Sequence, residues 1–211
     1  MPGGMSVEAA SSDAERRALY IRIWKRWIDV LLSALGIAVL FLPMLVIALI
    51  IAAEDPGPVI FRQERVGLHR KRFELLKFRT MRLDTPPNLP TDMLKDPERY
   101  LLRCGKTLRK YSLDELPQLV NILRGDMSVV GPRPLIGRGN ESAVIEAREK
   151  CGANDIRPGL TGLAQISGRD LVDNAEKARL DGEYVRRQSF WFDCRCFFRT
   201  IGKVITHEGV K

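Results

Sequence analysis

The stretch IDVLLSALGIAVLFLPMLVIALIIAA, residues 28–53, decides the fold of this chain. Its single charged residue is Asp29, close to the N-terminal edge. A membrane-spanning helix needs roughly 20 consecutive apolar residues, and this run is longer. The apolar region of a cleaved signal peptide is shorter, about 7–15 residues, and is followed by a small-residue cleavage site that is not found here. The sequence therefore predicts a helix that enters a membrane.

Pro43 lies near the middle of this run, where a proline removes a helix hydrogen bond and bends the helix. Basic residues flank the run on both sides: Arg16, Arg17, Arg22, Lys25 and Arg26 precede it, and Arg62, Arg65, Arg70, Lys71 and Arg72 follow it. A spanning helix normally carries this excess on its cytoplasmic flank alone. The charges therefore favour a re-entrant helix that is broken at Pro43, with both ends in the cytoplasm. A kinked span with a weak charge bias is the alternative.

Three regions follow from this reading. Residues 1–15 have little pattern and are expected to form a flexible tail. Residues 16–55 combine the membrane helix with a segment of basic and aromatic residues that suits the headgroup zone of a bilayer. Residues 56–211 are expected to form a cytoplasmic domain.

Composition narrows the function without deciding it. The chain has 211 residues, 45% of them hydrophobic, which allows one domain with a sizeable core plus a membrane element. The formal net charge of +8 indicates an anionic partner: nucleic acid, a membrane surface or a phosphate-bearing substrate. The four cysteines match no zinc-binding spacing, so we interpret them as reduced structural thiols.

The predicted domain is α+β and mainly helical. Strands are expected at 59–63 and 72–78 around a turn at Gly67, with a proline-containing loop over 82–97. Helices are expected at 98–110, 113–124, 139–151, 173–188 and 189–205, with irregular segments at 125–134 and 157–170. The last helix is rich in aromatic residues, which either pack in the core or lie on the membrane.

Ser112-Leu113-Asp114-Glu115 is the strongest local signal, and it has two interpretations. In the structural one, Ser112 caps a helix and Glu115 reaches back to it, as in a capping box. In the functional one, an ionised Asp114 attacks phosphorus while Glu115 helps to hold Mg²⁺, which binds one or two protein carboxylates together with substrate phosphates. Taken alone, the motif favours the capping box.

Several cations suit a phosphate ligand, because arginine forks match phosphate oxygens and lysine supplies a point charge. They lie beside glycine and proline turns rather than on helix faces: Lys77, Arg79, Arg109, Arg133, Arg157 and Arg169. Each one taken singly is equally compatible with a solvated surface charge. The sequence has no P-loop, no dinucleotide-binding glycine motif and no H-E-x-x-H zinc motif, so those site classes are unsupported.

These residues fall within an ordered set of motifs that resembles the bacterial sugar transferase family, the monotopic phosphoglycosyl transferases in their small, catalytic-domain-only form. The set is KRWID (25–29), the proline-broken helix, PVIFRQERVG (58–67), KFRTM (77–81), SLDELPQL (112–119), GDMSVVGPRP (125–134), RPGLTGLAQISGR (157–169) and LDGEYV (180–185). The resemblance covers about residues 25–210. One departure is Leu42, where relatives often have a serine before the helix-breaking proline.

The resemblance implies a re-entrant membrane helix packed on a small cytoplasmic α/β catalytic domain with short strands and amphipathic interfacial helices. It also implies the reaction: Asp114 attacks the β-phosphate of a UDP-sugar, UMP leaves, and polyprenyl (undecaprenyl) phosphate takes the sugar phosphate from the aspartyl intermediate. Asp114 and Glu115 would bind Mg²⁺. By the same resemblance, Lys77, Arg79, Arg109 and Arg133 would contact phosphates, and Arg157, Gln165, Arg169, Asp181 and Tyr184 would shape the substrate pocket.

Further expectations follow from the family. The enzyme would lie in the bacterial inner membrane with its catalytic domain on the cytoplasmic face, and would catalyse the first membrane step of exopolysaccharide, O-antigen, capsule or glycoprotein glycan synthesis. Its partners would be membrane lipid and later glycosyltransferases of the pathway, and not nucleic acid. The sequence specifies neither the transferred sugar nor the oligomeric state, for which a dimer is one of the options. A membrane-tethered basic adaptor and a metal-dependent phosphohydrolase are the competing interpretations.

Overall fold

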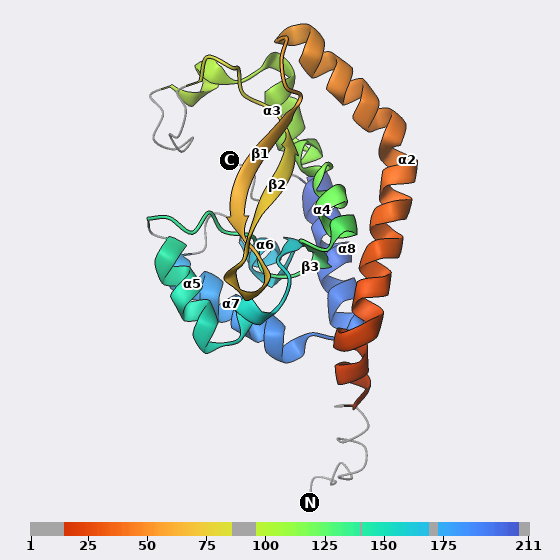
Figure 1. The fold of residues 1–211 in the computed structure, drawn as a ribbon, viewed down its shortest axis with the longest axis vertical. Helices are drawn as coiled ribbons and strands as arrows, with labels where there is room; N and C mark the ends of the chain where they lie inside the picture. The colour runs from red at the N-terminus through yellow and green to blue at the C-terminus, as the bar shows by residue number, and fades with distance from the viewer. Residues whose placement is uncertain (1–14, 86–95, 140, 169–172, 207–211) are drawn as a thin grey trace, which may run out of the picture.

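The computed structural model describes residues 15–85, 96–139, 141–168 and 173–206, so most of the expected N-terminal tail and Arg169 lie outside the described residues. The described part is mainly helical, with two small two-stranded sheets (Figure 1). One long helix, α2, runs along one side of the molecule, and the rest of the described chain lies to one side of it. This agrees with the expected α+β class dominated by helices.

Helix α2 spans Lys25–Glu54 and is preceded by a π-helical turn, Tyr20–Trp24. The predicted break at Pro43 is wrong: the helix continues through this residue as one element. A proline removes one helix hydrogen bond and can bend a helix without ending it, and Figure 1 shows α2 bending in its C-terminal half. One face packs on the domain through Ile37, Leu40, Met44, Ile47 and Ile51. The opposite face is apolar and exposed along its whole length, including Leu31, Leu35, Val39, Leu42, Val46 and Leu49. In the described ranges, α2 with its N-terminal extension is the one helix that is long and apolar enough to cross a membrane, which indicates membrane association.

The predicted hairpin is confirmed. Strand β1 (Ile60–Val66) pairs antiparallel with β2 (Arg72–Phe78), with Ile60 opposite Phe78. The strands are joined through Gly67, whose N–H donates to the Lys71 carbonyl oxygen at 2.8 Å. Strand β1 extends beyond its predicted end at residue 63.

The helix predicted for residues 113–124 is wrong as a single element. The segment is divided into a 3-10 turn, Leu113–Glu115, and helix α4, Gln118–Arg124, with Pro117 between them. Proline has no N–H to donate, which explains why an α-helix begins after it more readily than it passes through it. The preceding helix, α3, is also shorter than predicted and covers Arg103–Lys110.

A second sheet lies in segments that were predicted to be irregular. Strand β3 (Ser128–Val130) runs parallel to β4 (Gly159–Thr161), and the short helix α6 (Leu163–Ser167) follows. The two backbones come so close that a Cβ on Gly159 would lie 2.1 Å from the Gly131 nitrogen. Glycine is therefore required where the two motifs meet, and this approach fixes the start of the loop that carries Arg133.

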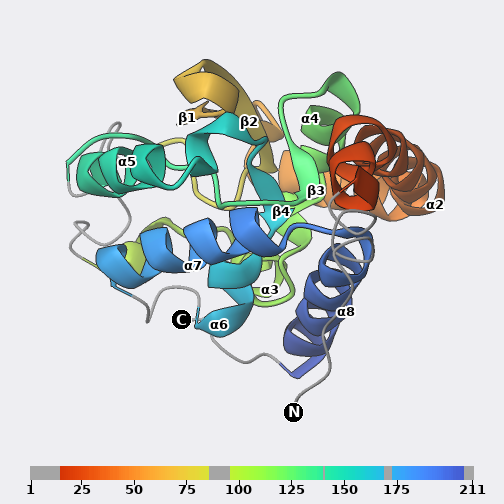
Figure 2. The same cartoon turned by 90° about the horizontal axis from the view of Figure 1, so that it is seen from below.

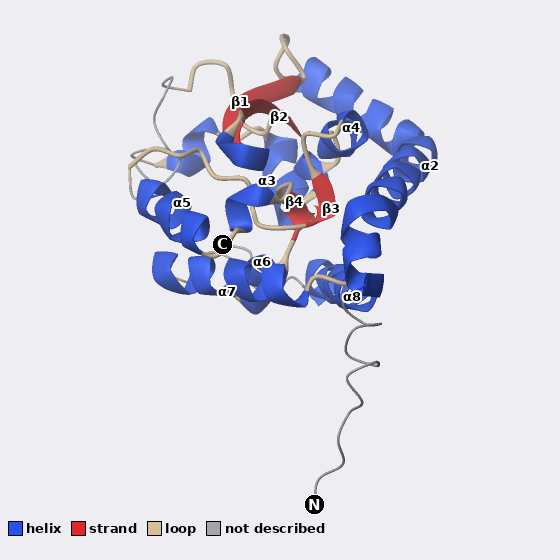
Figure 3. Cartoon of the chain, turned by 60° about the horizontal axis from the view of Figure 1, so that its bottom comes forward, coloured by secondary structure: helices blue, strands red, loops and turns tan. Residues whose placement is uncertain are grey.

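The remaining helices agree with their predicted ranges: α5 covers Glu141–Lys150, α7 covers Asn174–Arg187, and α8 covers Phe190–Thr206. Figure 3 shows β3 and β4 in the middle of the molecule, surrounded by helices. Seen from below in Figure 2, α5 and α7 lie on the side away from α2, and α8 lies close to its N-terminal end.

The core interpretation of the aromatic residues in α8 is correct for part of the set, and for the exposed part membrane contact stays a prediction. Phe192 and Phe197 pack against the main core, which includes Ile122, Met127 and Tyr184. Trp191 is 78% exposed and Phe198 67% exposed. Helix α8 therefore anchors itself with one face and presents aromatic side chains with another, as an interfacial helix does.

Candidate active site

Asp114 lies in the 3-10 turn that follows α3, and it is only 9% exposed. Ser112, the residue before this turn and two positions before Asp114, adopts a left-handed backbone conformation (φ 55°, ψ 24°), and its side chain makes no capping hydrogen bond. The capping-box interpretation is therefore wrong. A backbone conformation that non-glycine residues rarely adopt, next to a buried carboxylate, is more typical of a functional site than of a helix start.

The pKa of Asp114 is raised above its ordinary value as the result of opposing effects. Burial raises its pKa, and the neighbouring Glu115 carboxylate raises it further, whereas the positive charges of Lys77 and Arg109 lower it. A three-residue turn offers little of the dipole that a long helix provides. The two cations, rather than a helix end, therefore favour the ionised form of Asp114.

Glu115 connects the Asp114 turn to two of the predicted phosphate-binding residues. Its Oε1 atom lies 3.0 Å from Lys77 Nζ on β2 and 3.8 Å from Arg133 Nη2, in the loop after β3. The side chains of Lys77 and Glu115 are about four-fifths buried, while Arg133 is half-exposed. Three segments that are distant in the sequence thus converge beside Asp114.

Arg65 lies beside Lys77, Glu115 and Arg133, although it was not among the predicted site residues. Strand residues alternate between faces, so Arg65 on β1 and Lys77 on β2 share one face of the hairpin. Together with Glu115 and Arg133 they line a small hollow whose remaining wall consists of Leu75, Gln118, Pro134, Gly159 and Leu160. The signal that could have found Arg65 was the hairpin register, which places it on the side of Lys77.

Arg109 lies close to Asp114, and its positive charge lowers the pKa of Asp114. Its Nε atom donates to Thr80 Oγ1 at 2.9 Å, so the side chain is held in place by β2's C-terminal extension. Arg79 and Arg157 have other partners. Arg79 is buried and pairs with the Asp55 carboxylate, and Arg157 Nε donates to the Gly125 carbonyl oxygen at 2.9 Å.

The predicted pocket residues of α6 and α7 are buried and have protein partners. Asp181 forms an ion pair with Arg148 at 2.6 Å and is 1% exposed. Gln165 Nε2 donates to the Leu160 carbonyl oxygen at 3.1 Å, and Tyr184 lies in the main core. The structure does not bring these three side chains to the hollow around Glu115. Their contact with a substrate stays a prediction, as does that of Arg169.

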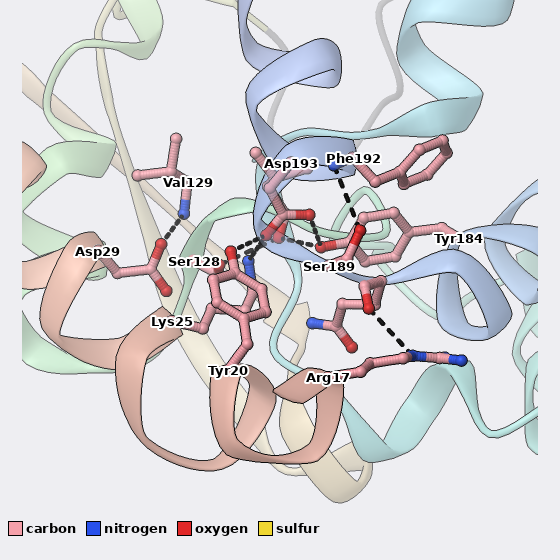
Figure 4. Close-up of polar contacts among 12 residues, drawn as sticks. Arg17, Tyr20, Lys25, Asp29, Ser128, Val129, Tyr184, Ser189, Phe192 and Asp193 are labelled. Atoms are coloured by element: carbon pink, nitrogen blue, oxygen red, sulfur yellow. Dashed lines mark hydrogen bonds and ion pairs between the residues drawn. The ribbon is translucent and has the colours of Figure 1, made fainter. Parts of the chain in front are cut away.

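A second polar cluster joins the start of α2 to the domain (Figure 4). Asp193 on α8 accepts hydrogen bonds from Tyr20 and Lys25, both at 2.6 Å, and its other oxygen lies 2.8 Å from the Tyr184 hydroxyl. Asp29 accepts a hydrogen bond from the Val129 N–H at 2.9 Å, directly at β3. We refer to Tyr20, Lys25, Tyr184 and Asp193 as the Asp193 cluster.

The other end of α2 is attached to the same domain. The Glu54 carboxylate accepts hydrogen bonds from the backbone N–H groups of Arg103 and Cys104, the first two residues of α3. Asp55, the next residue, pairs with Arg79 at the end of β2. Both ends of the apolar helix are thus bound to the domain that carries Asp114.

The chain matches the family model described as bacterial sugar transferase over residues 20–207. It is 41% identical to the uncharacterized sugar transferase EpsL of Bacillus subtilis, over 74% of either chain. It is 40% identical to a UDP-glucose:undecaprenyl-phosphate glucose-1-phosphate transferase of Caulobacter vibrioides, over 88% of this chain and 71% of the relative.

A UDP-galactose-lipid carrier transferase of Erwinia amylovora is 38% identical over 89% of this chain, which spans only 42% of that relative. The shared region in all three relatives includes the segments that carry Asp114, the hairpin and Arg133, because each match covers most of this chain. By its match over nearly its whole length, the chain belongs to the bacterial sugar transferase family.

Proposed function

We propose that this protein is a membrane-bound phosphoglycosyl transferase that moves a sugar-1-phosphate from a UDP-sugar to polyprenyl phosphate and releases UMP. The observation that carries the proposal is the buried Asp114 carboxylate beside a hollow lined by Arg65, Lys77 and Arg133. Family membership supports the reaction class, and the names of two relatives state an undecaprenyl-phosphate or lipid-carrier transferase activity.

The proposed chemistry is nucleophilic. A carboxylate oxygen of Asp114 attacks the β-phosphorus of the UDP-sugar, a new O–P bond forms, and the bond to the UMP oxygen breaks. A phosphate oxygen of the polyprenyl phosphate then attacks the same phosphorus, and the Asp114 carboxylate leaves. Lys77 and Arg109 favour the ionised nucleophile, because their charges lower its pKa against the effect of burial. Arg133 would contact the phosphate oxygens that gain charge during transfer.

The acidic residues could hold a Mg²⁺ ion only together with phosphate oxygens of the substrate. The described residues hold no group of three or more acidic, histidine or cysteine side chains suited to a metal ion. Asp114 and Glu115 are adjacent carboxylates, and Mg²⁺ commonly binds one or two carboxylates plus substrate phosphates. Such an ion would neutralise charge on the diphosphate, and these two residues would hold it.

For the membrane helix we propose the re-entrant arrangement, with the domain on the cytoplasmic face of the inner membrane. A straight helix of this length would separate its ends by about 45 Å. Both ends of α2 are nevertheless bound to one domain, through the Asp193 cluster and through Glu54 and Asp55. A polar domain does not cross the bilayer, so the two ends belong on one side of it. Basic residues on both flanks support the cytoplasmic side.

The experiment that tests the proposal is UMP release from UDP-sugars by the full chain in detergent or nanodiscs, with and without polyprenyl phosphate. We expect UMP with each turnover and a lipid-linked sugar phosphate as product. Free sugar phosphate in place of the lipid-linked product would identify a phosphohydrolase instead. Relatives are named for glucose and galactose, so a panel of UDP-hexoses and UDP-N-acetylhexosamines is the appropriate screen.

A further inference from the structure

Arg65 is held in an unusual environment for an arginine. Its Nη1 donates to the Pro134 carbonyl oxygen at 3.2 Å and its Nη2 donates to Gln63 Oε1 at 2.6 Å. Its Nε atom is buried and has no hydrogen-bond partner among the described residues. Buried donors are almost always paired in folded proteins, because an unpaired one costs about 1–3 kcal/mol. An unpaired guanidinium donor in the wall of a hollow is the pattern of a binding site.

The charges around Arg65 also indicate a binding site, in this case for an anion. Burial and, to a smaller extent, the nearby Arg133 guanidinium together lower its pKa to about 10. The hollow has three cations in its wall, Arg65, Lys77 and Arg133, against the single carboxylate of Glu115. Like charges that are partly removed from water repel one another strongly. An anion at the mouth of the hollow would remove this repulsion and, after a shift of the Arg65 side chain that exposes its buried Nε, supply an acceptor for that atom.

The position of the hollow identifies the anion by its chemistry. Glu115 lines the hollow and is the neighbour of the nucleophile proposed here, so a phosphate attacked by Asp114 must lie close by. Arginine binds phosphate through paired N–H donors, with stronger hydrogen bonds than neutral donors make. Leu75 and Leu160 form the apolar part of the wall and offer no competing acceptor from their side chains.

We propose that Arg65 is a phosphate-binding residue of the transfer site, with its Nε–H as a donor to a phosphate oxygen of the substrate. This inference rests on the proposed function, because it assumes that a phosphate comes to Asp114. The shared ligand chemistry is a phosphate oxyanion, which either the UDP-sugar diphosphate or the polyprenyl phosphate can supply. Arg65 contributes alongside Lys77 and Arg133 and raises the number of hairpin cations at the site to two.

The kinetic test compares Arg65→Gln and Arg65→Lys with Arg62→Gln as the matched control. Arg62 is on the opposite face of β1, is two-thirds exposed and pairs with Glu74. Loss of one charged hydrogen bond predicts a fall of about 10- to 100-fold in kcat/KM for Arg65→Gln. Arg65→Lys should recover part of this loss, and Arg62→Gln should match the wild type.

Varying each substrate in turn distinguishes the two phosphate sources. An effect on kcat/KM for the UDP-sugar assigns Arg65 to the diphosphate, and an effect confined to polyprenyl phosphate assigns it to the acceptor. Unchanged constants for both substrates in a folded Arg65→Gln protein would overturn the proposal.

A binding measurement separates this inference from the proposed function and from a folding defect. In an Asp114→Asn background, calorimetric titration with UMP, with a UDP-sugar and with polyprenyl phosphate should give clear binding, and adding Arg65→Gln should weaken at least one of these by tenfold or more. Equal affinities in the single and double variants would reject the role of Arg65 even if Asp114 is catalytic. Full turnover by Asp114→Asn would reject the proposed function itself, whatever Arg65 does.

Discussion

The Asp193 cluster and the hollow around Glu115 each place one carboxylate beside a lysine, but they differ in whether their hydrogen-bonding groups all have partners. Asp193 is 6% exposed, and its two oxygens are occupied by one lysine and two tyrosine hydroxyls. Around Glu115 the cations outnumber the carboxylates, and Arg65 Nε has no partner in the described structure. A buried polar cluster that satisfies all of its members fixes a structure, whereas one that leaves donors unpaired is ready for a ligand.

The largest effect is expected from Asp114→Asn. The amide cannot act as the nucleophile, so UMP release should fall by at least about 1,000-fold, the scale seen when a nucleophile is removed. The folded state of this variant should be more stable than that of the wild type. Burial raises the pKa of Asp114, so its ionisation in the folded state is unfavourable, and asparagine does not ionise.

The pH dependence of the stability of Asp114→Asn tests the direction of this effect. A carboxyl with a raised folded-state pKa contributes stability below its ordinary pKa and loses that contribution as pH rises through the folded-state value. The unfolding midpoint of Asp114→Asn should therefore exceed that of the wild type by an amount that grows as the pH rises from the ordinary pKa to the folded-state value and stays constant above it. A lower midpoint at neutral pH would contradict the role of burial at this position.

Asp193→Ala is the corresponding change in the closed cluster, and it should act on stability first. It leaves the Lys25 ammonium and two tyrosine hydroxyls without their acceptor, and breaking a buried ion pair costs about 3–5 kcal/mol. Chemical unfolding in detergent would measure the loss. Asp155→Asn is the control, since Asp155 is two-thirds exposed beside His69. Equal unfolding of Asp193→Ala and the wild type would remove the distinction between the two clusters.

A smaller effect is expected on the pH dependence of UMP release. Lys77 lowers the pKa of Asp114 and Glu115 raises it. The acid limb of kcat/KM should therefore move to higher pH in Lys77→Met and to lower pH in Glu115→Gln, whatever the change in absolute rate. Shifts in the same direction for both variants would show that the limb belongs to another group.

The smallest effect is expected from Arg179→Gln on the exposed face of α7. Arg179 pairs with Glu176 at 2.6 Å, but its side chain is more than half exposed, and exposed pairs contribute little. Turnover should change by less than about twofold, because the pair touches neither cluster. This variant measures the background against which the effects of Asp114→Asn, Asp193→Ala, Lys77→Met and Glu115→Gln are compared.

The local pattern of the sequence predicted the hairpin and the helices α5, α7 and α8 well. The hairpin is short-range, with alternating strands around Gly67, and each of these helices has an unbroken helical segment of ten or more residues. The small parallel sheet was missed, because β3 and β4 have three residues each and their pairing partners are about thirty positions apart. Such short strands carry no periodicity, and glycine at their contact resembles a loop signal.

The sequence also identified some of the site residues correctly and could not decide the role of others. Asp114, Glu115, Lys77 and Arg133 were recognisable as residues suited to phosphate chemistry, and the structure brings the last three into contact. Arg79 looked equally suitable in sequence, yet it pairs with Asp55 inside the protein, and Asp181, which the family resemblance assigned to the substrate pocket, pairs with Arg148. Charge and turn context could not separate these cases, because an arginine that clamps a carboxylate and one that faces a ligand have the same sequence appearance.

The sequence by itself determined that the chain has an apolar helix with basic flanks, a mainly helical domain and an acidic pair in an ordered set of family motifs. These properties depend on composition and on short-range spacing. The tertiary structure alone decided that both ends of α2 attach to one domain, that Asp114 is buried, and that Arg65 joins Lys77 and Arg133 at Glu115. The reason is physical: burial and charge pairing depend on which distant segments meet, and chain packing sets that.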